Sequence, residues 1–169
     1  MYNLIVQLIG IVAMLLCLLC YHFKKRQHLL ITKLLADILW ALHYILIGGV
    51  SAFLTNVVCT MRETVYLVDK SEKRRPLQLI FFLALIWILV IIFNKGAAGV
   101  LPAVASSLGT YSFWQKSITK TRIIALIIAI LMFTYDIFFK SYAGLINESF
   151  TMISVIIAMI NAKRYEKNS

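Results

Sequence analysis

The sequence predicts an all-α integral membrane protein, in which seven transmembrane helices form two parallel three-helix bundles joined by a linker helix (3+1+3). Apolar composition, long uncharged segments and a weak internal repeat predict this class. Of the 169 residues, 62% are hydrophobic and 14% are charged, which is unlike a soluble domain of this length. Segments 2–21 and 77–93 carry no charge and can each cross about 30 Å of hydrocarbon.

The first three spans are expected at 2–22, 28–47 and 50–68. Basic residues follow the first span at Lys24 and Lys25. A cleaved secretory signal has the opposite order, so we expect this span to be retained. Gly48-Gly49 separates the second and third spans and predicts a tight turn between antiparallel helices.

The last four spans are expected at 77–94, 97–115, 121–139 and 142–161. A polar stretch from Asp69 to Pro76 precedes them and divides the chain into halves. Small residues dilute the hydrophobicity of the fifth span, which lets helices approach closely. Pro102 in that span is expected to interrupt the backbone hydrogen bonds.

The basic residues predict the orientation of the seven spans. The loops after the first, third and fifth spans, together with the C-terminus and the adjoining helix ends, hold 14 of the 17 basic residues. These are Lys24, Lys25, Arg26, Lys33, Lys70, Lys73, Arg74, Arg75, Lys116, Lys120, Arg122, Lys163, Arg164 and Lys167. Because basic loops stay in the cytoplasm, we expect the N-terminus outside and the C-terminus inside.

An internal repeat relates the two halves. Asn56-Val-Val-Cys-Thr-Met and Asn147-Glu-Ser-Phe-Thr-Met match at their first, fifth and sixth positions, 91 residues apart, and the same ungapped alignment pairs Tyr44 with Tyr135. Four spans separate each equivalent pair, so the two halves point the same way in the membrane. The expected domains are a first repeat at 1–69, a cytoplasmic loop and linker helix at 70–95, a second repeat at 96–162 and a cytoplasmic tail at 163–169.

Two stretches carry a resemblance to known families. They are Trp40-Ala-Leu-His-Tyr-Ile-Leu-Ile-Gly48, followed by Asn56 and Arg62, and Tyr142-Ala-Gly-Leu-Ile-Asn-Glu148, followed by Ser154. With the three-one-three arrangement, they resemble the YgjV-type bacterial inner-membrane proteins, which have no assigned substrate. The arrangement is also similar to that of the SWEET sugar transporters and the wider PQ-loop group.

This resemblance implies a multi-pass protein of the bacterial inner (plasma) membrane. In SWEETs, an Asn on the third helix and an Asn on the seventh face each other across the substrate pocket, and Asn56 and Asn147 fall at these places. Prolines act as hinges in that family, and Pro102 is the corresponding hinge candidate here.

Polar residues inside the expected spans are candidates for function, because they are costly in hydrocarbon unless they have partners. Asn56, Thr60 and Glu63 share one face of the third span at spacing i, i+4, i+7, and Asn147, Thr151 and Ser154 repeat this spacing in the seventh. On the second span Asp37, Trp40 and Tyr44 share a face. Tyr135 and Asp136 come from the sixth span.

These side chains predict a solute site and a coupling site. The solute would be bound by amides, hydroxyls and aromatic rings from Asn56, Asn147, Trp40, Tyr44, Thr60, Thr151 and Tyr135. An ion or proton would be handled by the ionisable residues Asp37, His43, Glu63 and Arg62.

Other interpretations stay open at this point. The Asn56 and Asn147 amides can serve only to join neighbouring helices. The long side chains of Arg62 and Glu63 can extend to the membrane interface. His43 can be a satisfied core or interfacial histidine rather than a proton carrier.

The sequence therefore predicts a transporter or facilitator for a small polar solute, working by alternating access between the two bundles. The alternative is a non-transporting receptor or assembly protein with the same fold. No enzyme, cofactor or metal site is expected, because neither a Ser–His or paired-Asp arrangement on facing helices nor an H-E-x-x-H motif is visible. Expected partners are the bilayer and the solute, and both a monomer and a homo-oligomer stay open. Nucleic acid is not expected, since a basic cytoplasmic face against anionic lipid accounts for the net charge of +10.

Overall fold

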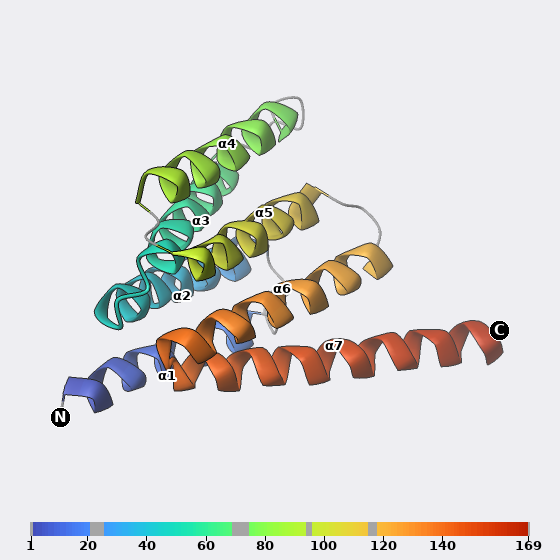
Figure 1. Cartoon of the computed structure of the whole chain (residues 1–169). Coiled ribbons are helices and arrows are strands. Elements are labelled where there is room, and N and C mark those ends of the chain that lie inside the picture. Colours follow the sequence, from blue (N-terminus) through green and yellow to red (C-terminus); the bar gives the residue numbers. More distant parts are fainter. Residues whose placement is uncertain (1, 21–25, 69–74, 94–95, 115–117, 169) are drawn as a thin grey trace.

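A computed structural model of the chain describes residues 2–20, 26–68, 75–93, 96–114 and 118–168, and these ranges are helical apart from short turns. They contain seven α-helices and one 3-10 helix (Figure 1). The elements are α1 (Tyr2–Cys20), α2 (Arg26–Leu46), α3 (Val50–Val68), α4 (Arg75–Phe93), η2 (Ala97–Gly99), α5 (Val100–Trp114), α6 (Ile118–Phe139) and α7 (Tyr142–Asn168). The all-α prediction is confirmed, with each helix at an expected span.

Two details differ from the sequence-based expectation. Pro102 is the third residue of α5, where a backbone N–H has no partner within the helix, so the ring interrupts no hydrogen bond of α5. Helix α7 continues through most of the expected tail and ends at Asn168.

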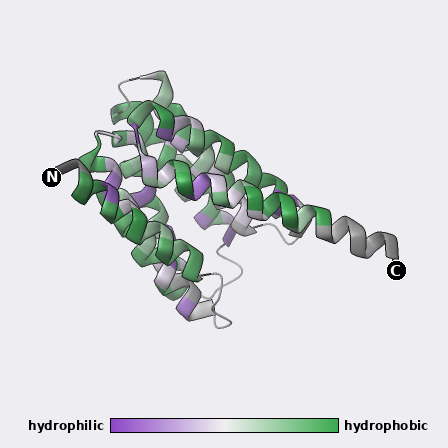
Figure 2. Ribbon diagram, turned by 90° about the horizontal axis from the view of Figure 1, so that it is seen from below, coloured by the Kyte–Doolittle hydropathy of each residue, from purple (hydrophilic) through white to green (hydrophobic). Residues whose placement is uncertain are grey.

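The outer surface of the helices is apolar. Three segments are long and apolar enough to cross a membrane: Arg75–Phe93, Thr119–Phe139 and Tyr142–Ile160. Leu4–Leu19 is a shorter apolar helix, and hydrophobic residues predominate along the chain (Figure 2). Helix α4 buries one stripe, Phe82, Ile86 and Val90, and leaves Ile91 74% exposed. Such a surface suits lipid rather than water.

The packing separates the helices into two groups. Helices α1, α2 and α3 pack in order and form the first triplet, and α5, α6 and α7 pack in order and form the second triplet. Helix α1 contacts α7, α3 contacts α5, and α4 lies against both α3 and α5. The six triplet helices therefore close a ring, with α4 outside it.

One end of this ring holds the tight turns. The α2–α3 and α6–α7 turns, the start of α1 and the start of α5 lie at this turn end, on the left of Figure 1. The opposite end, where α2, α4 and α6 begin and α7 ends, is called the C-terminal end.

The two tight turns have the same hydrogen-bond pattern. The N–H of Gly49 donates to Tyr44 O at 2.8 Å, and the N–H of Ser141 donates to Asp136 O at 3.0 Å. The preceding residues, Gly48 and Lys140, both have positive φ, at 82° and 52°. The turns thus match at a spacing of 92 residues, one more than the spacing of the sequence repeat. Since each residue turns a helix by about 100°, this difference changes which side chains are equivalent.

Candidate functional site

Helix α2 carries a polar stripe through the interior of the protein. Lys33, Asp37, Trp40 and Tyr44 are spaced i, i+4, i+7 and i+11, so they share one face of the helix. Asp37, Trp40 and Tyr44 are buried. The stripe joins two groups of polar side chains, one near the turn end and one nearer the C-terminal end.

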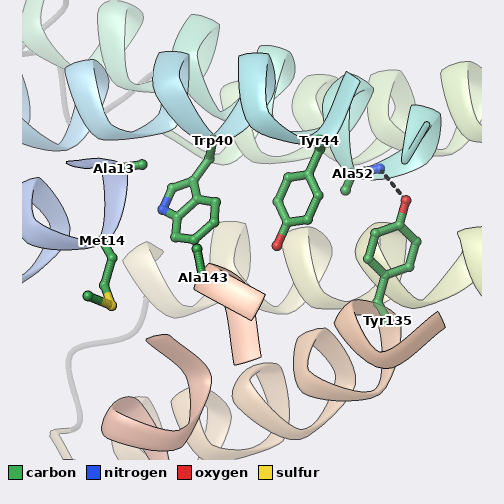
Figure 3. Packing of buried hydrophobic residues seen from close by; sticks show 7 residues of the cluster. All are labelled: Ala13, Met14, Trp40, Tyr44, Ala52, Tyr135 and Ala143. Carbon is green, nitrogen blue, oxygen red and sulfur yellow. Dashed lines mark hydrogen bonds between the residues drawn. The ribbon is translucent and has the colours of Figure 1, made fainter. Parts of the chain in front are cut away.

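The turn-end cluster consists of His43, Tyr44, Tyr135, Asp136 and Ser141, all of them buried. The Tyr44 hydroxyl donates to Asp136 Oδ1 at 2.9 Å, which links the first triplet to the second. Figure 3 shows Trp40 and Tyr44 of α2 directed toward Ala143 and Tyr135 of the second triplet. The aromatic rings of Trp40 and Tyr44 stack at 5.6 Å and fill the space around the polar contact.

His43 connects α1, α2 and the α6–α7 turn. Its Nδ1 lies 2.9 Å from Val6 O, and its Nε2 lies 2.8 Å from Ser141 Oγ. A carbonyl oxygen only accepts, so Nδ1 carries the proton, and Nε2 of the neutral ring accepts from the Ser141 hydroxyl. The same Ser141 oxygen accepts the N–H of Gly144 at 3.2 Å and so caps α7. His43 is thus a buried histidine with both ring nitrogens satisfied.

Tyr135 makes the corresponding contact with the first turn. Its hydroxyl accepts the N–H of Ala52 at 3.4 Å (Figure 3). A Cβ at Gly49 would lie 2.8 Å from the Tyr135 hydroxyl, so Tyr135 fits only because residue 49 has no side chain. With the 92-residue spacing, Tyr135 is the counterpart of His43 and Gly49 is the counterpart of Ser141. Each triplet therefore reaches the other's turn from the same position.

Gln7 and Gly10 join α1 to the α6–α7 turn and to the start of α7. Gln7 donates from Nε2 to Lys140 O at 3.3 Å and accepts the N–H of Ala143 at 3.2 Å. Gly10 lies so close to α7 that a Cβ there would be 2.6 Å from the Cβ of Ala143. Between α1 and α7 the turn end is consequently closed by both hydrogen bonds and close helix packing.

The second group, the charge cluster, consists of Lys33, Asp37, Arg62 and Glu63. Lys33 Nζ lies 2.9 Å from Asp37 Oδ1 and 3.4 Å from Glu63 Oε1. Arg62 Nη2 also lies 3.4 Å from Glu63 Oε1. Two positive and two negative groups make the cluster neutral as a unit.

The charge cluster reaches the second triplet through Arg62. Its Nη1 donates to Thr110 Oγ1 of α5 at 2.7 Å, and Thr110 donates in turn to Ser106 O at 2.8 Å. Arg62 and Glu63 are 3% and 0% exposed, so these side chains turn inward and do not extend to the interface. Their charges are matched inside the protein, as polar groups in hydrocarbon require.

The two predicted solute-binding amides lie apart from these clusters. Asn56 donates from Nδ2 to Ala52 O at 2.8 Å, and Asn147 donates from Nδ2 to Glu148 Oε1 at 2.9 Å. Thr60 and Thr151 also donate within their own helices, to the backbone oxygens of Asn56 and Asn147. No hydrogen bond joins the two amides in the described part of the chain. With the spacing of the turns, the counterpart of Asn56 is Glu148, so the two amides differ by about 100° around their helices.

A half-open hollow of about 260 Å³ lies at the turn end. Its lining comes from both triplets, η2 and the end of α4: Gly48, Val50, Ser51, Phe93, Gly96, Ala98, Gly99 and Phe139. None of the predicted solute-binding residues lines it. Among the residues that the structure describes, no three His, Cys, Asp or Glu side chains are placed to hold a metal ion.

The comparison with known families covers nearly the whole chain. The model of Imp-YgjV, a bacterial inner membrane protein family, matches residues 4–166. The chain belongs to the Imp-YgjV family. The predicted relation to YgjV-type proteins is thus confirmed, and the family places the buried charges within a membrane protein. No curated protein and no solved structure matches the chain.

In this Imp-YgjV family member, several residues of the two clusters and their contacts were not predicted as site residues from the sequence. Lys33 is one, although its i, i+4 spacing to Asp37 inside an apolar segment is a readable signal. Ser141 is another, and its position just before α7 indicates a helix cap. Gln7 and Thr110 gave no signal, because their partners lie far away in the sequence.

Proposed function

We propose that this membrane protein is a transporter or facilitator for a small polar solute, working by alternating access between two three-helix bundles. The first bundle is the first triplet (1–69), the second is the second triplet (96–162), and α4 within 70–95 links them. The reciprocal contacts at the turn end carry this proposal. His43 reaches Ser141 of the second turn, and its counterpart Tyr135 reaches Gly49 of the first.

The helix contacts support the same two-fold relation. A two-fold axis along the membrane normal that exchanges the triplets turns the α1–α7 contact into an α5–α3 contact, and both contacts are present. Tyr44 and Asp136 are counterparts that hydrogen-bond to each other, as residues near such an axis do. Parallel repeats of this kind are a common architecture of secondary transporters. A SWEET-like 3+1+3 bundle with seven spans is therefore the architecture that we propose, with Pro102 as its hinge candidate.

The exposure of α7 supports a conformation that is closed at the turn end. Ser141, Ala143 and Gly144 are buried, whereas none of the residues from 145 to 160 is. In the charge cluster, the Lys33 side chain remains 24% exposed. In the proposed orientation, with the N-terminus outside and the C-terminus in the cytoplasm, this conformation is closed to the outside. The solute would then enter or leave past the polar stripe of α2.

The assignment of residues to roles is part of the proposal. Solute contacts are assigned to Trp40, Tyr44 and Tyr135, with the amides and hydroxyls of Asn56, Asn147, Thr60 and Thr151. Ion or proton coupling is assigned to Asp37, His43, Glu63 and Arg62. The polar stripe on α2 supports this assignment, because it connects residues of both sets.

A receptor or assembly protein of the same fold is the second candidate. Two observations favour it: the Asn56 and Asn147 side chains are used within their own helices, and the hollow at the turn end is not lined by either amide. A protein of this kind would bind its partner without moving the triplets relative to each other.

Catalysis is not part of the proposed function. Ser141 and His43 form a pair like the nucleophile and base of hydrolases, but the Ser141 oxygen also caps α7. Both side chains are 0% exposed, so a substrate carbonyl would have no access to the hydroxyl in this conformation.

A thermal-shift screen of the purified chain against polar metabolites, followed by uptake into liposomes, tests the proposal. We expect a stabilising solute whose shift is lost in Trp40→Ala and kept in Trp87→Ala. Trp87 is the matched control because it lies on α4 and is 37% exposed. A solute that stabilises both variants as much as the wild type, or one that binds but is never taken up, would contradict transport through the α2 stripe.

A further inference from the structure

The carboxyl group of Asp136 differs from the other buried acids in having no cation beside it. Asp37 is paired with Lys33, and Glu63 with both Lys33 and Arg62. Asp136 is 0% exposed and has no ion pair among the described residues. Its Oδ1 accepts from the neutral Tyr44 hydroxyl, and its Oδ2 is buried without a hydrogen-bond partner.

Among the residues that the structure describes, no cation acts on Asp136. Tyr44 of α2 faces it directly, Tyr135 is its neighbour on α6, and Glu148 of α7 lies within electrostatic range. Lys140 at the end of α6 is exposed. Helix η2 has no titratable residue, and the one on α5, Tyr111, lies toward the other end. A bare carboxylate in these surroundings would be buried without compensation.

Oδ2 and the Ser141 hydroxyl share the space left by Gly144. A Cβ at Gly144 would overlap both Asp136 Oδ2 and Ser141 Oγ, so the two oxygens lie close together over the α7 backbone. The Ser141 hydroxyl has one proton, and its 2.8 Å contact with His43 Nε2 uses that proton. Oδ2 lies close enough to interact with the Ser141 side chain, but the two groups do not reach hydrogen-bond geometry.

We propose that Asp136 is a proton-binding site, that it holds one proton on Oδ2 when the turn end is closed, and that Ser141 connects it to His43. Transfer needs two proton movements. The Asp136 proton passes to Ser141 Oγ, and the original Ser141 proton passes to His43 Nε2. The products are a carboxylate, an unchanged hydroxyl and an imidazolium, and no other bond forms or breaks.

This site gives the proposed transporter a coupling device. Separation of the two triplets at the turn end would break the Tyr44–Asp136 and His43–Ser141 contacts together and admit water to the carboxyl group. The coupling role depends on the proposed function, whereas the presence of a proton on Asp136 does not. Asp136 and Ser141 would thereby join His43 in the coupling set.

Infrared spectroscopy of the full chain in lipid nanodiscs at neutral pH tests the site directly. We expect the carbonyl band of a protonated carboxylic acid in the wild type, its loss in Asp136→Asn, and its retention in Asp37→Asn and Glu148→Gln. Tyr44→Phe should keep the band and move it to higher frequency, because a hydrogen bond to the carbonyl oxygen is lost. Tyr44→Phe also keeps the test valid if Asp136→Asn does not fold.

The proposal is overturned if the wild type lacks the band, if the band survives in Asp136→Asn, if it disappears only in Glu148→Gln, or if it does not move in Tyr44→Phe. A sodium ion in place of the proton would give the first of these results. If the band behaves as expected while no solute is transported, the proposed function fails and the proton site stands.

Discussion

The α2–α3 and α6–α7 turns share a backbone conformation but differ in the side chains at equivalent positions. Both place a residue of positive φ before the same N–H···O contact. The first turn fills these positions with Gly48 and Gly49, and its small residues make room for Tyr135. The second fills them with Lys140 and Ser141, which supply a helix cap and a partner for His43. The two turns thus share a backbone pattern, and their different side chains make different contacts.

The charge cluster shows the same division of roles. At the 92-residue spacing, the counterparts of Lys33, Asp37, Arg62 and Glu63 are Ala125, Ala129, Ser154 and Val155. All four charges therefore lie in the first triplet, and none has a charged counterpart in the second. An arrangement of helices that is nearly two-fold in its contacts is strongly asymmetric in charge.

Loss of one acid from the charge cluster should have the largest effect on stability. Glu63→Ala leaves Arg62 buried without its partner carboxylate, so we expect the free energy of unfolding to fall by about 3–5 kcal/mol. SDS titration in detergent micelles measures it. Arg62→Leu combined with Glu63→Leu removes one charge of each sign and should recover most of the loss.

The matched control lies in the second triplet. Ser154, the exposed counterpart of Arg62, should tolerate Ser154→Ala within about 0.5 kcal/mol. If the double variant is less stable than Glu63→Ala alone, the cluster is not held together as a neutral unit.

Gly144→Ala should have the next largest effect. The added methyl group would collide with Asp136 Oδ2 and Ser141 Oγ, and such overpacking costs roughly 1–3 kcal/mol. Gly109→Ala is the control, because a Cβ there would lie 3.8 Å from its nearest neighbour. The counterpart of Gly144 is Ala52, where the first triplet has the methyl group already. Equal stability of both glycine variants, measured by thermal unfolding, would contradict the close approach at Gly144.

Gly49→Ala should be destabilising by a smaller amount. The new Cβ would meet the Tyr135 hydroxyl at 2.8 Å, but the hydroxyl ends a side chain that can shift, so we expect roughly 1–2 kcal/mol. Tyr135→Phe in the same chain removes the hydroxyl and should restore part of the loss. Gly96→Ala is the control, since nothing lies within 4 Å of a Cβ there. Absence of any rescue would place the cost elsewhere than at Tyr135.

Tyr44→Phe should have the smallest effect, about 1 kcal/mol, because it removes one hydrogen bond and keeps the ring. A double-mutant cycle with Asp136→Asn isolates the contact between the two triplets. Tyr142→Phe provides the comparison, since Tyr142 is 61% exposed and should be neutral. Additive effects of Tyr44→Phe and Asp136→Asn would mean that the two side chains are not coupled.

The helices could be predicted from the sequence because apolar length is a local property. The pairing of Tyr44 with Asp136 could not. It depends on the 92-residue spacing of the turns, whereas the matching letters of the Asn-x-x-x-Thr-Met motif favour 91 and align Tyr44 with Tyr135. One residue in a helix changes the facing side by about 100°, so a small error of register misplaces every predicted contact.

The partners of the buried polar side chains could likewise be predicted only in part from the sequence. Lys33 and Asp37 are close in sequence, and their i, i+4 spacing indicates a pair. In the second triplet, the hydrogen-bond partners of Arg62 and His43 are Thr110 and Ser141, which are 48 and 98 residues away. Contacts of this separation follow from the closure of the helix ring, which apolar periodicity does not encode.

The account's central claim is that the polar contacts of the turn-end cluster hold the two triplets together and can break. The distance between the two tight turns tests this claim most directly. Val50 and Tyr142 begin α3 and α7, are counterparts, and are both exposed. Spin labels at Val50→Cys and Tyr142→Cys, with the native cysteines replaced, report this distance by pulsed electron resonance in nanodiscs. We predict a short distance between the labels in the otherwise unchanged protein. A second, longer distance should appear once Tyr44→Phe and His43→Gln remove the contacts to Asp136 and Ser141. One unchanged distribution in both proteins would contradict the account.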